Sequence, residues 1–457
     1  MCPAHLNKSS SVIGEIVMFS IGDLFNSASS FLISRLLSFL CFCGCSQQWL
    51  TFCILLIADD DIANPYLLNS FFFFSQASFW MKRVFESEGN LVNAATIPSL
   101  GPVTPTMRLK RCTYSQPHEL CCYSTDTHRK PIFDSRTQLK YYCAAKTPLD
   151  LKHGFPHKFI EPKQRLPNGR PTEYLDDLLE CLKHSKQSYK PHFCTWRGIA
   201  TLIMCTPYNR YDEPWQLRAS RCGNTVYLIK TPETKLQSNT KKMKSHSDDA
   251  MKQFMYMGYR FETISTSDKP QAIAEEDSEY MERLEADVDA NTQFCSVFRT
   301  KIGDFETVMG AEVDCITHDV SEGERVQNAY CELKTTRIFT HQKQQENFER
   351  QKMMQIWAQA FLCGVPRVII GFRRDDGMLD HVKEYETVEF PRIARKHAGC
   401  WDPNYCLSFL QQVLRFIWDT VRLSGPDIVY TISYSPQSKL IEVQQVSHSL
   451  QFLPDGT

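Results

Sequence analysis

The sequence predicts a mixed α/β fold in which helices pack against β-sheets. Three observations lead to this prediction. Short apolar segments typical of strands alternate with helical segments over the C-terminal half of the chain. Proline and glycine clusters separate segments from residue 105 onwards, and no repeat of fixed period is visible. Apolar and charged fractions of 42% and 23% exclude a disordered, collagenous or purely membrane-embedded chain.

The first 100 residues differ from the rest of the chain. They hold 12 of the 29 phenylalanines but only four Lys or Arg residues. The 23 residues from Leu36 to Ala58 carry no charge, a length that could span a bilayer. Two glutamines in the middle of this stretch, and the thiol-rich chain after it, favour a segment that does not anchor the protein in a membrane. We therefore expect a hydrophobic N-terminal extension with no assigned fold over residues 1–104, and one folded domain over residues 105–457.

The first elements of this domain are predicted from caps, turns and periodicity. A helix over Thr172–His184 begins at Thr172 as its N-cap and carries leucines on one face. The turn Cys222-Gly223-Asn224 predicts a β-hairpin between two apolar segments. The hairpin strands are expected at Trp215–Ser220 and Thr225–Lys230. Three further helices are expected: Thr195–Met204, Asp248–Met257, which ends at Gly258, and the acidic surface helix Glu275–Asp289.

The later elements follow from the same signals. Strands are expected at Phe294–Arg299, Ala311–Cys315, Tyr330–Thr335 and Arg367–Phe372. Between the last two of these strands, a helix is expected at Gln345–Phe361. A further helix begins after Pro403, because apolar residues recur there at helical spacing. Two closing strands, Asp427–Tyr434 and Leu440–Val443, predict a hairpin at the end of the domain.

Cysteine usage and net charge restrict the class of protein. Nineteen cysteines are scattered along the chain without a CxxC pair, which indicates a reducing compartment, buried free thiols and no structural zinc. The 51 basic residues against 52 acidic ones exclude a protein that holds nucleic acid by charge alone. Four common catalytic or nucleotide-binding motifs are missing from the sequence. These are the dinucleotide-binding fingerprint, the phosphate-binding loop, the G-x-S-x-G elbow and the H-E-x-x-H motif.

Two short strands carry paired charges. In Glu312-Val313-Asp314 and Glu332-Leu333-Lys334, the charged residues are two apart and share one face, while Val313 and Leu333 point into a core. If the strands pair, three carboxylates and a lysine converge. This is a hard-oxygen site for Mg²⁺ or Mn²⁺, with a lysine that can stabilise charge on a phosphate. The pattern is that of metal-dependent phosphodiester cleavage.

Such a pattern also arises by chance, and two strands with a solvated polar face are the alternative. Two further features favour a site. Glu262 lies in Gly258–Glu262, which we interpret as a strand with Tyr259 and Phe261 on the opposite face. Downstream, Lys352, Gln355 and Gln359 form a polar stripe on the Gln345–Phe361 helix.

Seven motifs follow one another along the chain: Trp196-Arg197-Gly198, Gly258–Glu262, Gly310–Cys315, Glu332–Thr335, Trp357–Phe361, Gly364-Val365-Pro366 and Gly371-Phe372-Arg373. From about residue 110 to the C-terminus, this set resembles the DXO family of RNA decapping nucleases. The resemblance implies a mixed α/β domain with two β-sheets and flanking helices, related to the D…(D/E)xK nucleases.

The resemblance implies a role for each matching residue. Two divalent ions, Mg²⁺ or Mn²⁺, would be bound by four carboxylates and one backbone carbonyl, those of Glu262, Glu312, Asp314, Glu332 and Leu333. Hydrolysis would be carried out by Glu312, Asp314, Glu332 and Lys334. Substrate contacts would come from Arg129, Glu173, Trp196, Arg197, Gly198, Cys295, Glu312, Lys334 and Gln359. For Arg129 a surface arginine, and for Cys295 a buried structural thiol, is the alternative.

The implied activity is removal of abnormal RNA 5′ ends. It includes hydrolysis of the whole NAD moiety from NAD-capped RNA, cleavage of incomplete caps and, in some members, 5′→3′ exonuclease digestion. A second hypothesis is a binding subunit that stabilises a nuclear 5′→3′ exoribonuclease, and a third is a DNA nuclease of the same fold. RNA 5′ ends are the expected partner and a membrane is not. The free thiols favour the nucleus or cytosol, and the resemblance favours the nucleus.

Overall fold

The computed structural model describes residues 97–163, 175–186, 189–209, 213–230, 248–270, 277–422 and 428–446. The charge-free stretch Leu36–Ala58, the predicted cap Thr172 and the predicted substrate contact Glu173 lie outside these residues. Among the described helices, none is long and apolar enough to cross a membrane.

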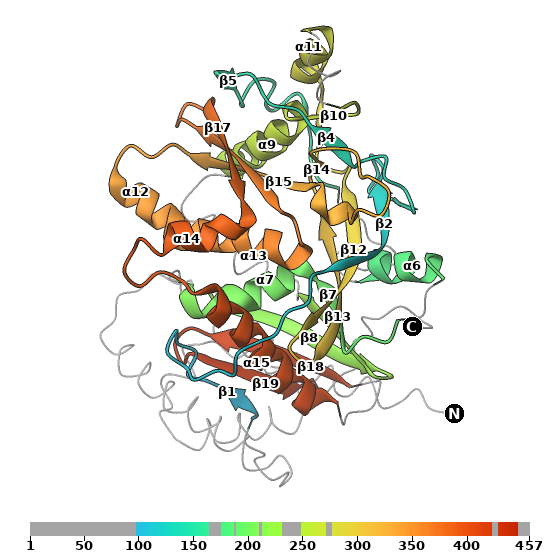
Figure 1. Ribbon diagram of the computed structural model, residues 1–457, viewed down its shortest axis with the longest axis vertical. Helices are drawn as coiled ribbons and strands as arrows, with labels where there is room; N and C mark the ends of the chain where they lie inside the picture. The colour runs from blue at the N-terminus through green and yellow to red at the C-terminus, as the bar shows by residue number, and fades with distance from the viewer. Residues whose placement is uncertain are drawn as a thin grey trace, which may run out of the picture. The chain divides into compact units, whose positions relative to one another are not determined.

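A ten-stranded sheet forms one layer of the domain (Figure 1). Parallel and antiparallel neighbours are mixed, because β13 pairs in parallel with β7 and antiparallel with β12. The two residues of β1 pair with β19, so the sheet includes chain that precedes residue 105. In spatial order the strands are β1 (Ser99–Leu100), β19 (Leu440–Gln445), β18 (Val429–Ser435), β8 (Trp215–Cys222), β9 (Thr225–Lys230), β7 (Phe193–Trp196), β13 (Phe305–Glu312), β12 (Phe294–Ile302), β2 (His118–Thr125) and β3 (Pro131–Phe133).

A seven-stranded sheet forms the second layer. Its centre is the parallel pair β15–β16, with β14 antiparallel to β15 on the other side. The order is β10 (Thr266–Ser267), β4 (Lys140–Tyr142), β14 (Cys315–Ile316), β15 (Tyr330–Arg337), β16 (Arg367–Arg373), β17 (Met378–Glu386) and β5 (Leu149–Asp150). A parallel ribbon pairs β6 (Phe159–Ile160) with β11 (Val288–Asp289). The predicted mixed α/β fold with two main sheets and flanking helices is confirmed.

The main core lies where three helices meet both sheets. Side chains of α7 (Arg197–Cys205), α13 (Met353–Cys363) and α15 (Pro403–Val421) pack with residues of both sheets into one cluster. Figure 1 shows α7 and α13 side by side in the middle of the domain, with α15 below them. Smaller clusters lie under α6 (Asp176–His184) on the large sheet and under α9 (Asp248–Ile264) on the small one. The remaining α-helices within the described residues are α11 (Asp277–Glu285), α12 (Gln342–Asn347) and α14 (Phe390–Ala394).

Two sequence predictions about Glu262 are wrong. The helix does not end at Gly258, and Gly258–Glu262 is not a strand, because α9 continues to Ile264. Tyr256, Met257, Phe261 and Ile264 recur at helical spacing and are buried, so packing against the small sheet outweighs the cost of about 1 kcal/mol for a helical glycine. The Glu262 side chain therefore projects from α9.

The two charged segments converge as predicted, but the strand predicted over Ala311–Cys315 is divided between the two sheets. The strand with Glu312 belongs to the large sheet and β15 to the small one. The chain crosses between the sheets at Val313 and Asp314, and β14 then pairs with β15 through Cys315 and Cys331. The predicted helix Gln345–Phe361 is likewise divided, because a turn of π-helix at Phe348–Lys352 separates α12 from α13.

Candidate active site

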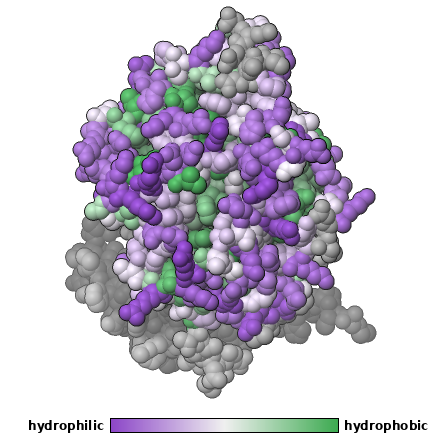
Figure 2. All heavy atoms as spheres, viewed as in Figure 1, coloured by the Kyte–Doolittle hydropathy of each residue, from purple (hydrophilic) through white to green (hydrophobic). Residues whose placement is uncertain are grey.

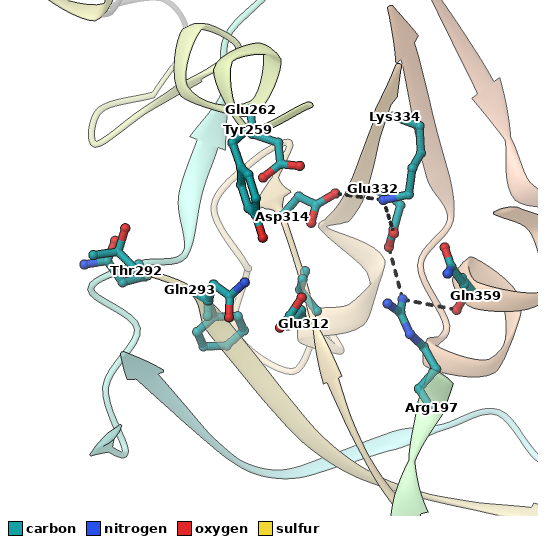
Figure 3. Close-up of a pocket in the computed structure, with 13 residues that line it drawn as sticks. Arg197, Tyr259, Glu262, Thr292, Gln293, Glu312, Asp314, Glu332, Lys334 and Gln359 are labelled. Carbon is teal, nitrogen blue, oxygen red and sulfur yellow. Dashed lines mark hydrogen bonds and ion pairs between the residues drawn. The ribbon is translucent and has the colours of Figure 1, made fainter. Parts of the chain in front are cut away.

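Four carboxylates line one pocket of about 270 Å³ where the two sheets meet (Figure 3). Glu312 ends β13, Asp314 lies between β13 and β14, and Glu332 lies on β15. Glu262 reaches the pocket from α9, which packs against β15. Val313 and Leu333, 3% and 1% exposed, point into the core as predicted and so hold their charged neighbours on the pocket side.

Two cations tie the carboxylates together. The Lys334 Nζ lies 2.6 Å from Glu332 Oε1 and 3.7 Å from Asp314 Oδ2, and donates to the Leu333 carbonyl at 3.0 Å. The Arg197 Nη1 lies 3.1 Å from Glu332 Oε2 and donates to the Gln359 carbonyl at 3.4 Å. Asp314 Oδ2 also accepts from the Leu333 amide at 2.6 Å. These contacts fix β15, α7 and α13 around a single glutamate.

Burial and crowded charge set the pKa values of the acids. Burial, with the charge of Asp314 next, raises the pKa of Glu262 well above its usual range. Burial also raises the pKa of Asp314 to about 6, although Lys334 opposes this. Burial would raise the pKa of Glu332 too, but the charges of Lys334 and Arg197 outweigh it and lower that pKa to about 2. The pocket therefore holds carboxylates in unequal environments.

The chemistry of this donor set fits a divalent cation. Four carboxylates against two cationic side chains leave a surplus of two negative charges when all are ionised. Within the described part of the chain, no three acidic, histidine or cysteine side chains form a compact ligand group. In Figure 3, Glu332 is turned towards Arg197 and Lys334. A bound cation therefore requires the carboxylates to turn towards each other.

The other predicted residues lie at different distances from the pocket. Gln359 lines it. Arg129 stands at its edge, where its Nη2 donates to Gln293 Oε1 at 3.2 Å. Gly198 is exposed at the start of α7. Cys295 is 3% exposed and pairs with Glu312 across β12 and β13, but it is not among the lining residues.

Trp196 packs against β13, the strand that ends at Glu312. Its ring fills the space beside Gly310 on β13, since a Cβ at Gly310 would lie 2.5 Å from Trp196 Cζ3 and 3.0 Å from Leu178 Cδ1. We expect Gly310→Ala to lower the free energy of unfolding by about 1–3 kcal/mol, because the ring and the buried leucine must both shift. Urea unfolding followed by tryptophan fluorescence measures this. Gly258→Ala is the control, since a Cβ there meets nothing within 4 Å; equal stability of both variants would contradict the expectation.

Several lining residues are not among the site residues that the sequence predicts. Tyr259 is one turn before Glu262 on α9, and burial raises its pKa to about 12. A strand would place Tyr259 and Glu262 on opposite faces, whereas the helix places both at the pocket. Thr292 and Gln293 precede β12, and Gln138 precedes β4. A polar pair directly before an apolar strand was the available signal for Thr292 and Gln293.

The fold and the site together define a nuclease of the PD-(D/E)XK class, in which acids at strand ends are followed by a lysine two residues after the last of them. A family model described as RAI1 like PD-(D/E)XK nuclease matches residues 115–457, and the chain belongs to this family. Its curated relatives are named decapping nucleases.

Relatives and solved structures agree with this family. The decapping and exoribonuclease protein of Bos taurus is 32% identical over 355 residues, which cover 75% of this chain and 84% of the bovine protein. The decapping nuclease RAI1 of Neurospora crassa is 32% identical over 360 residues, 77% of this chain and 84% of that protein. Candida albicans Rai1, solved in complex with pU5 and Mn²⁺, matches with a TM-score of 0.68 and 28% identity, covering 77% of this chain and 94% of that one. Scheffersomyces stipitis Rai1, solved with (3′-NADP)⁺ and calcium, matches with a TM-score of 0.66 and 25% identity, over 77% and 94%.

Proposed function

We propose that this protein is a metal-dependent hydrolase that removes the whole NAD moiety and incomplete caps from RNA 5′ ends, with 5′→3′ exoribonuclease digestion as a further activity. The observation that carries this is the set of four carboxylates and Lys334 around one pocket. The family's named decapping activity and the pU5 and (3′-NADP)⁺ complexes of its relatives support the substrate class. We place this activity in the nucleus, where a 5′→3′ exoribonuclease is the proposed protein partner.

Two divalent ions, Mg²⁺ or Mn²⁺, are the proposed cofactors. Glu262, Glu312, Asp314, Glu332 and the Leu333 carbonyl would hold them, because these oxygens surround the same pocket. Such ions activate water and neutralise the leaving oxygen of a phosphodiester.

The cationic side chains would position the phosphate. Lys334 and Arg197 both bind Glu332 in the structure, so a substrate phosphate that enters the pocket meets two cations already fixed in place. The planar fork of Arg197 suits two phosphate oxygens. Gln359 and Tyr259 line the same pocket and can donate further hydrogen bonds to the 5′ end.

The test is hydrolysis by the full chain with Mg²⁺ or Mn²⁺. The substrates are NAD-capped RNA, unmethylated cap RNA, triphosphate RNA, monophosphate RNA and duplex DNA of the same sequence. Release of intact NAD from NAD-capped RNA is the expected result. Faster turnover of DNA than of every RNA would overturn the proposal, and binding of an exoribonuclease without any hydrolysis would favour the stabilising subunit.

Metal binding should be visible without turnover. Because an ion that binds only the folded protein stabilises it, Mn²⁺ at about 100 times its Kd should add about 2.7 kcal/mol to the free energy of unfolding. Thermal unfolding with Mn²⁺ or EDTA measures the difference. We expect Asp314→Asn to remove most of the shift, while Glu306→Ala, an exposed acid on the same strand as Glu312, keeps it. An unchanged shift in Asp314→Asn would contradict the ligand assignment.

A further inference from the structure

A polar stripe leads out of the pocket along α13. Gln359 lines the pocket. Gln355 precedes it by four residues and Lys352, the N-cap of α13 and last residue of the π-helical turn, by seven, both on the same side of the helix. Both of these side chains are exposed. At 1.5 Å per residue the stripe extends about 10 Å beyond Gln359. It therefore continues the pocket lining onto the surface.

An apolar stripe leads out of the same pocket along α9. Tyr259 and Glu262 line the pocket, and Phe254 and Met255 lie one turn further from it. Each of these two apolar side chains is 43% exposed. Between them and Glu262, a Cβ at Gly258 would meet no heavy atom within 4 Å, so the helix surface is open there. The face drawn in Figure 2 is mostly hydrophilic, with small hydrophobic areas between the charged ones.

Arg373 connects the two stripes. It ends β16, and its guanidinium carbon lies 5.1 Å from the centre of the Phe254 ring. Desolvation lowers the pKa of Lys352, and the positive charge of Arg373 lowers it further. Among the described residues, no carboxylate is ion-paired with Lys352 or Arg373, and none accepts a hydrogen bond from the buried Arg373 Nε. Two adjacent cations thus lie beside an exposed ring. The charge of Asp375 also acts on Arg373, but among the described residues neither cation forms an ion pair.

We propose that Phe254, Lys352 and Arg373 form a track for single-stranded RNA, on the 3′ side of the phosphate that is cleaved; this rests on the proposed function. Phosphates pair with the two cations, and a base stacks on the Phe254 ring. The pocket of about 270 Å³ accommodates a 5′ end, but the rest of an RNA chain must run over the surface. A double strand keeps its bases stacked inside, so the track selects unpaired RNA.

The test compares two substrates that share one 5′ cap. The long one carries about ten unpaired nucleotides after the cap, and the short one carries a single nucleotide. We expect Lys352→Gln to lower kcat/KM on the long substrate about 3- to 10-fold and to reduce the slope of log kcat/KM against log salt by about 1, with the short substrate unaffected.

Phe254→Leu should lower kcat/KM on the long substrate about fivefold or more, and Phe254→Tyr should restore it, because the ring and not the apolar area is required. Arg422→Gln, which removes an exposed cation paired with Asp419 at the end of α15, is the matched control.

A binding measurement distinguishes failure of the proposed function from failure of the RNA track. Fluorescence anisotropy of labelled single-stranded RNA of ten nucleotides, with Ca²⁺ in place of Mg²⁺, reports the track without turnover. If the wild type hydrolyses neither capped substrate but Lys352→Gln and Phe254→Leu still weaken RNA binding, the proposed function is wrong and the track stands. If both variants bind and cleave the long substrate like the wild type and Arg422→Gln, or lose long and short substrates equally, the track is wrong.

Discussion

Replacement of Glu312 and Asp314 together by alanine should lower kcat for hydrolysis of capped RNA by about 1,000-fold or more, because two of the four proposed metal-ligating acids are removed. Asp314 is the more connected of the two. It joins Lys334 and the Leu333 amide, and it is the carboxylate whose charge contributes most to the raised pKa of Glu262. Its loss therefore affects both ion binding and the position of the lysine. Single-turnover release of the cap, measured at saturating Mn²⁺, gives the rate.

The fold should survive this double change. The crowded negative charges cost free energy in the folded protein, so removing two of them offsets the lost hydrogen bond to Leu333. We expect the thermal midpoint to stay close to that of the wild type. Glu306→Ala is the activity control, because this residue is exposed on the same strand and faces Lys301 across β12. Release of the cap at the wild-type rate by the double variant would show that the reaction takes place elsewhere.

Replacement of Trp401 by alanine should lower the free energy of unfolding by about 3–5 kcal/mol. This side chain is 1% exposed and precedes Asp402, the N-cap of α15. Its ring centre lies 5.0 Å from that of Trp357, and its Nε1 donates to the Glu349 carbonyl at 3.1 Å. The change leaves a large cavity beside α13 and removes the hydrogen bond to the π-helical turn.

Trp401→Phe separates the two contributions. The smaller ring keeps most of the tilted ring contact with Trp357 but cannot donate to Glu349, so we expect a loss of about 1–3 kcal/mol. Urea unfolding of both variants gives the two values. A loss below 1 kcal/mol for the alanine variant would mean that this cluster does not hold α13 in place.

The strands and helices with regular spacing could be predicted from the sequence. Cys222-Gly223-Asn224 identified the hairpin β8–β9, and the apolar spacing after Pro403 identified α15. Burial of Val313 and Leu333 beside charged neighbours was enough to place the acids on one surface. These predictions succeed because each depends on residues close together in the chain.

The predictions that failed depend on distant partners. A glycine at position 258 signals a helix end locally, but Phe261 packs on Gly371 of β16 and keeps the helix intact, so Glu262 was assigned to the wrong element. The assignment of Glu312 and Glu332 to different sheets likewise follows from long-range pairing of β13 with β7 and β12 and of β15 with β16. Gln293 and Arg129 meet at the pocket edge only because β2 and β12 pair.

The crossing at Val313 and Asp314 has a mechanical consequence. Only these two residues join β13 in one sheet to β14 in the other, with Glu312 at the end of β13 and Glu332 on β15, the strand that pairs with β14. A small rotation of one sheet against the other thus changes the distances between the acids, while the ladders within each sheet stay intact. The distances between the carboxylates therefore depend on the angle between the two sheets. Mild denaturant or pressure that loosens the interlayer contact should silence the enzyme before either sheet melts.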